Sequence, residues 1–205
     1  MYKRLSTMLP GLLLLSTAAC TDGGPTGAEE GKAAAEVRVH GDAPSGASES
    51  RSQSSSEATG EVEGSVDVQA RVYLQTEAGH WVEVTNGAAA QTVEASGSDD
   101  FRLLASSEIE ARSYHRVRLE FESVRGELSG GLALGIGGGS AIVHVETGSS
   151  GQVTVEREVD VAAHAGTTTR LDIDLNTAQW AGAASGTTGV VAESAFASAV
   201  SVTAH

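Results

Sequence analysis

Two aspartates in the C-terminal part of the chain, Asp172 and Asp174, have the spacing that most directly suggests chemistry. They alternate with apolar residues, so in a β-strand both carboxylates project from one face, about 7 Å apart. Paired carboxylates perform acid–base catalysis in glycoside hydrolases. The pattern is therefore compatible with a carboxylate-dependent hydrolase, or alternatively with a solvated strand face on which Arg170 neutralises the charge.

Aromatic side chains are a second group that could contact a ligand, and the chain has only two Trp, three Tyr and three Phe. If they are exposed on a sheet, Trp81, Tyr73 or Trp180 could stack against a sugar ring, because an aromatic ring offers a flat apolar face with a polar edge. The alternative interpretation is that these rings pack in the core or at a sheet edge. The candidate ligand-binding residues are thus Trp81 and Tyr73, together with Asp172 and Asp174.

Signatures of other chemistries are incomplete in the sequence. There is no Gly-x-Ser-x-Gly elbow, and the Gly-rich segment 135–139 lacks the Gly-Lys-Ser/Thr ending of a phosphate-binding loop. The six His residues show no His-x-x-x-His or His-x-His spacing, and a single Cys excludes Cys-rich zinc sites. We therefore expect no catalytic set of these classes, no metal and no cofactor.

The first 19 residues have the order of an export signal. Lys3 and Arg4 are positively charged, Leu9–Leu15 is largely apolar, small residues follow, and Cys20 comes next. The apolar run is too short to span a bilayer, which takes roughly 20 residues. The position of the only cysteine predicts a bacterial lipoprotein, in which the signal peptide 1–19 is removed and acylated Cys20 anchors the chain in the lipid membrane. The alternative is an ordinary cleaved signal.

Residues 20–34 begin with Cys20 and are otherwise mostly Gly, Thr, Ala and Glu, a composition that is typical of a flexible tether. The residue after Cys20 is Thr21, and not the Asp that commonly retains lipoproteins in the inner membrane of enteric bacteria. We therefore expect an exported protein of the cell envelope, held in the outer membrane rather than the inner one.

Acidic residues dominate the charge, because 27 Asp and Glu stand against 13 Lys and Arg, for a formal net charge of −14. Binding to nucleic acid needs a basic face, so we expect no nucleic-acid partner. The same balance disfavours polybasic attachment to anionic lipid. Besides the membrane, the partners to be expected are a glycan or another envelope protein.

Alternation of apolar and polar residues predicts β-strands along most of the chain. The clearest strand is 61–75, where every even position is apolar or Gly, and the turn Ala78–Gly79 then predicts a hairpin with 81–84. The strand 114–124 is expected inside a sheet, with its Tyr114 ring buried and the hydroxyl bonded to backbone. Further strands are expected at 36–40, 141–146, 152–161 and 168–176, with an apolar cluster at 101–104 and a final strand within 190–202 that could alternatively be helical over 192–199.

These elements predict an all-β fold, an antiparallel β-sandwich of about seven to nine strands. The domain would cover residues 35–205, with the Ser-rich segment 43–60 as a loop or insert, preceded by the signal peptide and tether. Within it, Arg157 lies on the apolar side of its strand, so we expect it at an edge, beside a carboxylate or in a bulge.

Three segments, taken in order, resemble a family of bacterial lipoprotein domains, the domain of unknown function 4382. Val37–Pro44 resembles the family's first strand with its Asp-Ala-Pro corner, Leu103–Leu119 its Leu-rich segment and Tyr-x-x-Val-Arg-Leu strand, and Leu171–Leu175 its Leu-Asp-hydrophobic-Asp strand. The resemblance covers about residues 35–180 and departs from the family at His40-Gly41 and in the Ser-rich insert. It implies a transthyretin-like sandwich lipoprotein without an established activity.

The sequence thus favours a non-enzymatic, lipid-anchored envelope protein that acts as a binding or structural β-sandwich module, with carbohydrate as the leading ligand class. The alternative is a hydrolase that uses Asp172 and Asp174. The two hypotheses differ in what they require around these carboxylates, because an enzyme needs a concave pocket with a polar partner beside them.

Overall fold

The computed structural model describes residues 31–42, 63–96, 100–129, 140–184 and 189–205. These residues are 65% strand and 10% helix, which confirms the all-β class. The predicted signal peptide 1–19, Cys20, most of the tether and the Ser-rich segment 43–60 lie outside the described residues.

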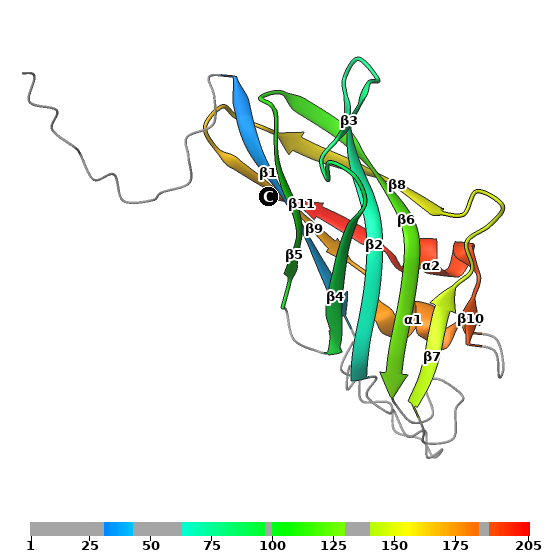
Figure 1. Cartoon of the computed structure of the whole chain (residues 1–205). Helices are drawn as coiled ribbons and strands as arrows, with labels where there is room; N and C mark the ends of the chain where they lie inside the picture. Colours follow the sequence, from blue (N-terminus) through cyan, green and yellow to red (C-terminus); the bar gives the residue numbers. More distant parts are fainter. Residues whose placement is uncertain (1–30, 43–62, 97–99, 130–139, 185–188) are drawn as a thin grey trace, which may run out of the picture.

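The described chain forms eleven strands and two short helices (Figure 1). In chain order they are β1 (Lys32–Asp42), β2 (Glu63–Thr76), β3 (Trp81–Glu83), β4 (Ala89–Ser96), β5 (Arg102–Glu110), β6 (Ser113–Ser129), β7 (Ser140–Val145), β8 (Val153–Ala162), β9 (Thr168–Asp174), α1 (Thr177–Gly182), β10 (Val190–Val191), α2 (Glu193–Ala199) and β11 (Ser201–Ala204).

The strands join into one curled sheet in which β10, β7, β6, β2, β4, β1, β9 and β11 follow one another, while β3 pairs with β2, β5 with β1 and β8 with β6. Three pairs are parallel, namely β1 with β4, β1 with β9 and β10 with β7. The predicted antiparallel sandwich of about seven to nine strands is therefore corrected to a mixed, curled sheet. Parallel pairing depends on contacts between distant segments, so local alternation does not reveal it.

β2 confirms the clearest sequence prediction. Its even-numbered residues from Val66 to Leu74 are buried, whereas the odd-numbered ones remain at least partly exposed. Gly64 on the same strand has a φ of 148°, and a Cβ there would lie 2.1 Å from the carbonyl oxygen of Glu127 on β6. Only glycine allows the two backbones to approach this closely.

β6 runs the length of the sheet, with β8 beside one half and β7 beside the other (Figure 1). On its other edge it pairs with β2, so it lies inside the sheet as predicted. The pairing shifts between Phe121 and Ser123, which leaves Glu122 as a β-bulge and moves the buried positions from odd to even numbers. Buried Val117, Leu119 and Phe121 are thus followed by buried Val124 and Leu128.

Tyr114 at the start of β6 is 1% exposed, and its hydroxyl donates a 2.9 Å hydrogen bond to the carbonyl oxygen of Glu110. Both features confirm the prediction. The bond ties β6 to the end of β5, in the manner of the tyrosine corners of β-sandwiches. Burial also raises the pKa of the Tyr114 hydroxyl above its ordinary value.

The C-terminal segment is not the single strand expected within 190–202. The alternative, a helix over 192–199, is confirmed by α2, which separates β10 from β11. Arg157 on β8 contacts the C-terminal end of this helix, where its guanidinium donates to the carbonyl oxygens of Ala197 and Val200. A cation there satisfies carbonyls at the end of α2 that have no partner within the helix. The partner of Arg157 is therefore a helix end rather than a carboxylate.

Three further elements depart from expectation. β1 begins at Lys32, so residues 32–34 of the predicted tether belong to the sheet. β4 and α1 have no counterpart among the predicted elements. Among the β4 residues whose burial is described, Ala89–Ala95, two side chains are buried, those of Val93 and Ala95, too few to produce a clear alternating pattern.

Candidate functional site

The outer surface of β3, β2, β6 and β8 carries the two aromatic residues that were predicted as ligand-binding residues. β3 folds back on β2 as the predicted hairpin, which places Trp81 opposite Gln75 and Glu83 opposite Tyr73. The odd-numbered residues of β2 point away from the core, so Trp81 and Tyr73 lie on the same outer face and are partly exposed.

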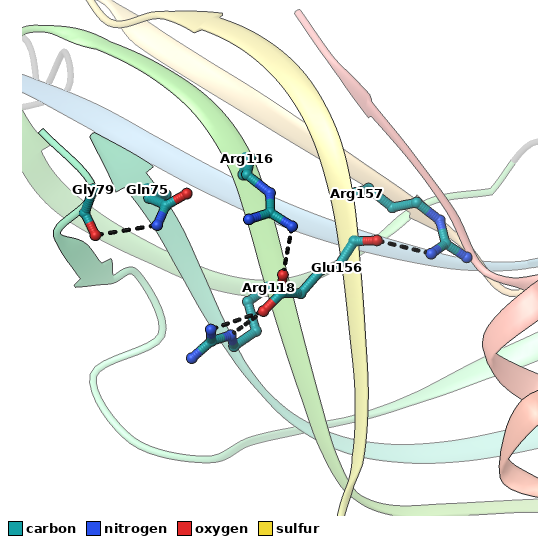
Figure 2. Close-up of polar contacts among 6 residues, drawn as sticks. All are labelled: Gln75, Gly79, Arg116, Arg118, Glu156 and Arg157. Atoms are coloured by element: carbon teal, nitrogen blue, oxygen red, sulfur yellow. Dashed lines mark hydrogen bonds and ion pairs between the residues drawn. The ribbon is translucent and has the colours of Figure 1, made fainter. Parts of the chain in front are cut away.

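A single carboxylate on β8 links two arginines of β6. The Arg116 Nη2 donates to Glu156 Oε2 at 2.6 Å, and the Arg118 Nε donates to Glu156 Oε1 at 2.8 Å. Figure 2 shows Glu156 reaching from β8 to both guanidinium groups, while Arg157 extends away from them. The bonds hold the two arginines in fixed positions on the sheet surface, because charge-assisted hydrogen bonds are stronger than neutral ones.

Arg118 also contacts Trp81, since its guanidinium carbon lies 4.1 Å from the centre of the indole ring. A cation over a Trp face is attracted to the negative charge of the ring face. One chain of contacts therefore runs from β8 through β6 to β3 and fixes the orientation of the indole. We call this surface the Trp81 face and define it by Trp81, Tyr73, Arg116, Arg118 and Glu156.

Tyr73 extends the Trp81 face toward Arg71 and Glu122. The Arg71 Nε lies 3.1 Å from Glu122 Oε1, and the Gln69 amide donates to Glu122 Oε2 at 3.1 Å. Burial raises the pKa of the Tyr73 hydroxyl, and its interaction with Arg71 partly opposes that shift. Tyr73 therefore stays protonated near neutral pH and keeps a hydroxyl that can donate to a ligand.

Asp172 does not lie on a solvated face, because it is only 8% exposed. Arg38 on the neighbouring strand β1 forms a bidentate pair with it, with distances of 2.8 Å from Nε to Oδ1 and 2.7 Å from Nη2 to Oδ2. The His205 Nε2 lies 3.3 Å from Oδ2. The neighbour that neutralises Asp172 is thus Arg38 rather than Arg170, which lies 4.0 Å from Glu36.

An apolar side chain covers part of this ion pair. The ring of Phe101 lies 5.1 Å from the guanidinium carbon of Arg38 and 4.9 Å from the ring of buried His40. The hydrogen bond to Asp172 is the main cause that raises the pKa of Arg38. These contacts are those of a structural ion pair that joins β1 to β9.

Asp174 shares the outer side of β9 with Asp172, yet its Oδ1 accepts a 3.0 Å hydrogen bond from the backbone N–H of Asn176. Two hollows of the described surface, of about 510 and 250 Å³, are lined by neither aspartate. The sequence correctly placed the two carboxylates on one strand, but both have structural partners there. The arrangement does not favour their use as an acid–base pair.

Trp180 is excluded as an exposed stacking residue, because it is fully buried in α1. Its ring packs edge-to-face against Phe196 of α2 at 5.8 Å, and Phe196 packs in the same way against Phe121 of β6 at 5.0 Å. For Trp180 the structure therefore confirms the alternative interpretation, in which the ring packs in the core.

Sequence reasoning missed Arg116, Arg118 and Glu156 as members of the site. The alternation in 114–124 did place the two arginines on the outer face, but no local signal pairs them with a carboxylate about 40 residues away. Only the register of β8 on β6, which sets Glu156 opposite Arg118, brings the three together.

Within the described ranges, no group of three or more His, Cys, Asp or Glu could hold a metal ion. The same residues include no helix long and apolar enough to cross a membrane. Comparison of the chain with family models, with curated proteins and with solved structures finds no match. The resemblance to the lipoprotein domain family stays a prediction.

Proposed function

We propose that the protein is a non-enzymatic, lipid-anchored module of the bacterial cell envelope that binds a glycan on the Trp81 face. The observation that carries this proposal is the indole of Trp81, which is held by Arg118 on an outer sheet surface that also carries Tyr73. A fixed ring costs little conformational entropy when a ligand stacks on it, which favours binding.

The polar groups beside Trp81 suit a ligand rich in hydroxyl groups. Arg116 and Arg118 supply N–H donors, and Tyr73 supplies a hydroxyl that both donates and accepts. Glu83 supplies its second oxygen as an acceptor, because its Oε1 already accepts from the Gly87 N–H. A flat apolar ring surrounded by both donors and acceptors matches a sugar, which has apolar ring faces and polar edges. The open sheet surface suits an extended chain of sugars better than a small molecule enclosed in a pocket.

The location is the second part of the proposal. Lipid attached to Cys20 would hold the domain at a membrane, with the outer membrane favoured by Thr21 after the cysteine. The membrane would then keep the Trp81 face close to envelope polymers, which raises the effective concentration of a weakly bound glycan. The resemblance to bacterial lipoprotein domains supports the same location.

Binding of the full chain, held in detergent, to a panel of neutral and acidic oligosaccharides tests the proposed function. We expect at least one class to bind, and Trp81→Ala to weaken its binding by about tenfold or more, because the stacked ring is lost. Leu103→Ala is the matched control, since Leu103 is 53% exposed on β5, which is not part of the Trp81 face. Equal binding by the two variants would contradict the proposal.

A further inference from the structure

We propose that Asn86 is a modification site, at which the side-chain amide reacts with the next backbone nitrogen and is converted, without an enzyme, to aspartate or isoaspartate. Glu83 is the general base of this reaction. The geometry that points to it is an exposed Asn-Gly pair in which the Gly87 N–H donates a 2.7 Å hydrogen bond to Glu83 Oε1. The inference does not depend on the proposed function.

The reaction closes a ring between two neighbouring residues. The Gly87 nitrogen bonds to the Asn86 Cγ while its proton passes to the Glu83 carboxylate. The bond from Cγ to Nδ2 then breaks, and Glu83 returns the proton to the leaving nitrogen, which departs as ammonia. Water opens the ring, at Cγ to give aspartate or at the backbone carbonyl carbon to give isoaspartate. Water is therefore the only co-reactant, and Glu83 ends as it began.

Each of the three reacting groups is available in the folded chain. Asn86 is exposed, and within the described residues its side chain has no hydrogen-bond partner. Gly87 has no side chain to obstruct the attacking nitrogen, and a Cβ built there would meet no atom within 4 Å. The distance of 2.7 Å from the Gly87 nitrogen to Glu83 Oε1 lies within the reach of a general base, about 2.6–3.2 Å.

The turn between β3 and β4 keeps these groups together. The φ angles are 53° at Asn86 and 104° at Gly87, in the left-handed region that Asn and Gly adopt most readily. Just before the turn, the Val84 N–H donates to the Val72 carbonyl oxygen at 2.7 Å, and the Val72 N–H donates to Thr85 Oγ1 at 3.1 Å. β2 thus anchors the start of the turn, and an intramolecular reaction gains from such positioning.

Asn176, the other asparagine of the chain, lacks this arrangement. It precedes the fully buried Thr177, and its Oδ1 accepts a hydrogen bond from the Gln179 N–H as the N-cap of α1. That bond occupies the side chain, and a β-branched residue after the asparagine crowds the nitrogen that would have to attack. Asn176 should therefore persist, which makes it an internal control.

Peptide mapping by mass spectrometry of the full chain, aged in detergent at neutral pH, tests the inference. We expect Asn86 to become a mixture of aspartate and isoaspartate while Asn176 in the same samples stays intact. Glu83→Gln should slow the conversion by about tenfold or more, because a glutamine amide does not take up the proton. Glu77→Gln is the matched control, since it removes an exposed carboxylate from the neighbouring turn between β2 and β3 and should leave the rate unchanged.

Two results would overturn the inference. If Asn86 stays as intact as Asn176 throughout ageing, the turn is not a modification site. If Glu83→Gln is converted at an equal or higher rate than the natural chain, the carboxylate of Glu83 holds the Gly87 N–H in place and does not act as its base. Neither result bears on Trp81-dependent binding of oligosaccharides, so the proposed function is decided separately.

Discussion

Glu156 fixes the positions of several side chains on the outer face of the sheet. Its two oxygens accept hydrogen bonds from two arginines, and one of these arginines supports the ring of Trp81. Exposed ion pairs contribute little to stability, typically 0–1 kcal/mol. The value of such a cluster lies in positioning, because it fixes side chains that would otherwise sample several rotamers. At the residue scale, the feature that matters most is the fixed position of the Trp81 ring on the outer face.

Tyr114 allows a test at the residue scale that is independent of any ligand. Tyr114→Phe removes the hydrogen bond to the Glu110 carbonyl, and we expect it to lower the free energy of unfolding by about 0.5–1.5 kcal/mol at neutral pH. Denaturant titration measures this change. A loss near the 3–5 kcal/mol typical of truncating a large buried ring would show that the substitution disrupts packing as well.

The raised pKa of Tyr114 also predicts a pH dependence. The folded state holds the tyrosine proton more tightly than the unfolded chain does, so the stabilisation is complete below the ordinary pKa of about 10 and is lost as the pH rises through the folded-state value. Unfolding measured from pH 8 to pH 11 should show a steeper decline in the natural protein than in Tyr114→Phe. Parallel curves would contradict the burial of the hydroxyl.

At the scale of elements, β2 and β6 follow from local alternation, whereas α1 was not predicted and α2 was only an alternative to a strand. In β2 the period of two is visible because one face is buried and the other is wet along the whole strand. The change of parity in β6 occurs at a bulge at Glu122, which is visible only in the pairing of β6 with β2. α2 ends where Arg157 binds its carbonyls, and that arginine is about 40 residues away in the sequence.

The same long-range dependence limits what the sequence revealed of the site. Trp81 and Tyr73 could be named as candidates because their residue types suggest stacking, and the hairpin that joins them is local. Asp172 could be placed on its strand face but not paired with Arg38, which is 134 positions earlier in the chain. Contacts between side chains of strands that are distant in the sequence therefore could not be predicted from the sequence.

The orientation of β2 can be tested with one substitution at two adjacent positions. Val68→Asn buries an amide without partners, so we expect a loss of several kcal/mol of unfolding free energy. Gln69→Asn shortens a side chain on the outer face and removes one hydrogen bond to Glu122, which should cost less than about 1.5 kcal/mol. Thermal melts of the two variants compare them, and similar shifts would be inconsistent with a strand buried on one face.

The role of Arg157 gives a second test at this scale. Arg157→Met keeps much of the apolar stem but leaves the carbonyls of Ala197 and Val200 without their donor. We expect faster amide hydrogen exchange in α2 and β11, with exchange in β2 unchanged, because the loss is local. Uniform protection in the variant would show that the helix does not depend on this contact.

On the scale of the whole molecule, the two short helices lie on the buried side of the curled sheet, where Trp180 and Phe196 pack into the core. The Trp81 face lies on the outer side, where Trp81 and Tyr73 are partly exposed. The proposed lipid anchor would hold that surface close to a membrane without adding contacts to the domain. Recognition by such an arrangement relies on a small number of fixed side chains, and multiple anchored copies would strengthen attachment to a polymer.

Lipid attachment is tested directly by detergent phase separation of the protein made in a bacterial host. The natural chain should enter the detergent phase, because acyl chains bury many methylene groups. Cys20→Ser, which differs in one atom of the side chain, should leave an exported protein in the aqueous phase. Recovery of the processed natural chain from the aqueous phase would show that Cys20 is not lipidated.

The central claim, that the Trp81 face binds a glycan, is tested most directly by acrylamide quenching of tryptophan fluorescence. Trp180 is fully buried, so quenching in the full chain reports on partly exposed Trp81. A saturating oligosaccharide that binds in the panel should lower the quenching constant and shift the emission to shorter wavelength, and Trp81→Phe should abolish both changes. An unchanged quenching constant with every oligosaccharide of the binding panel would contradict the claim.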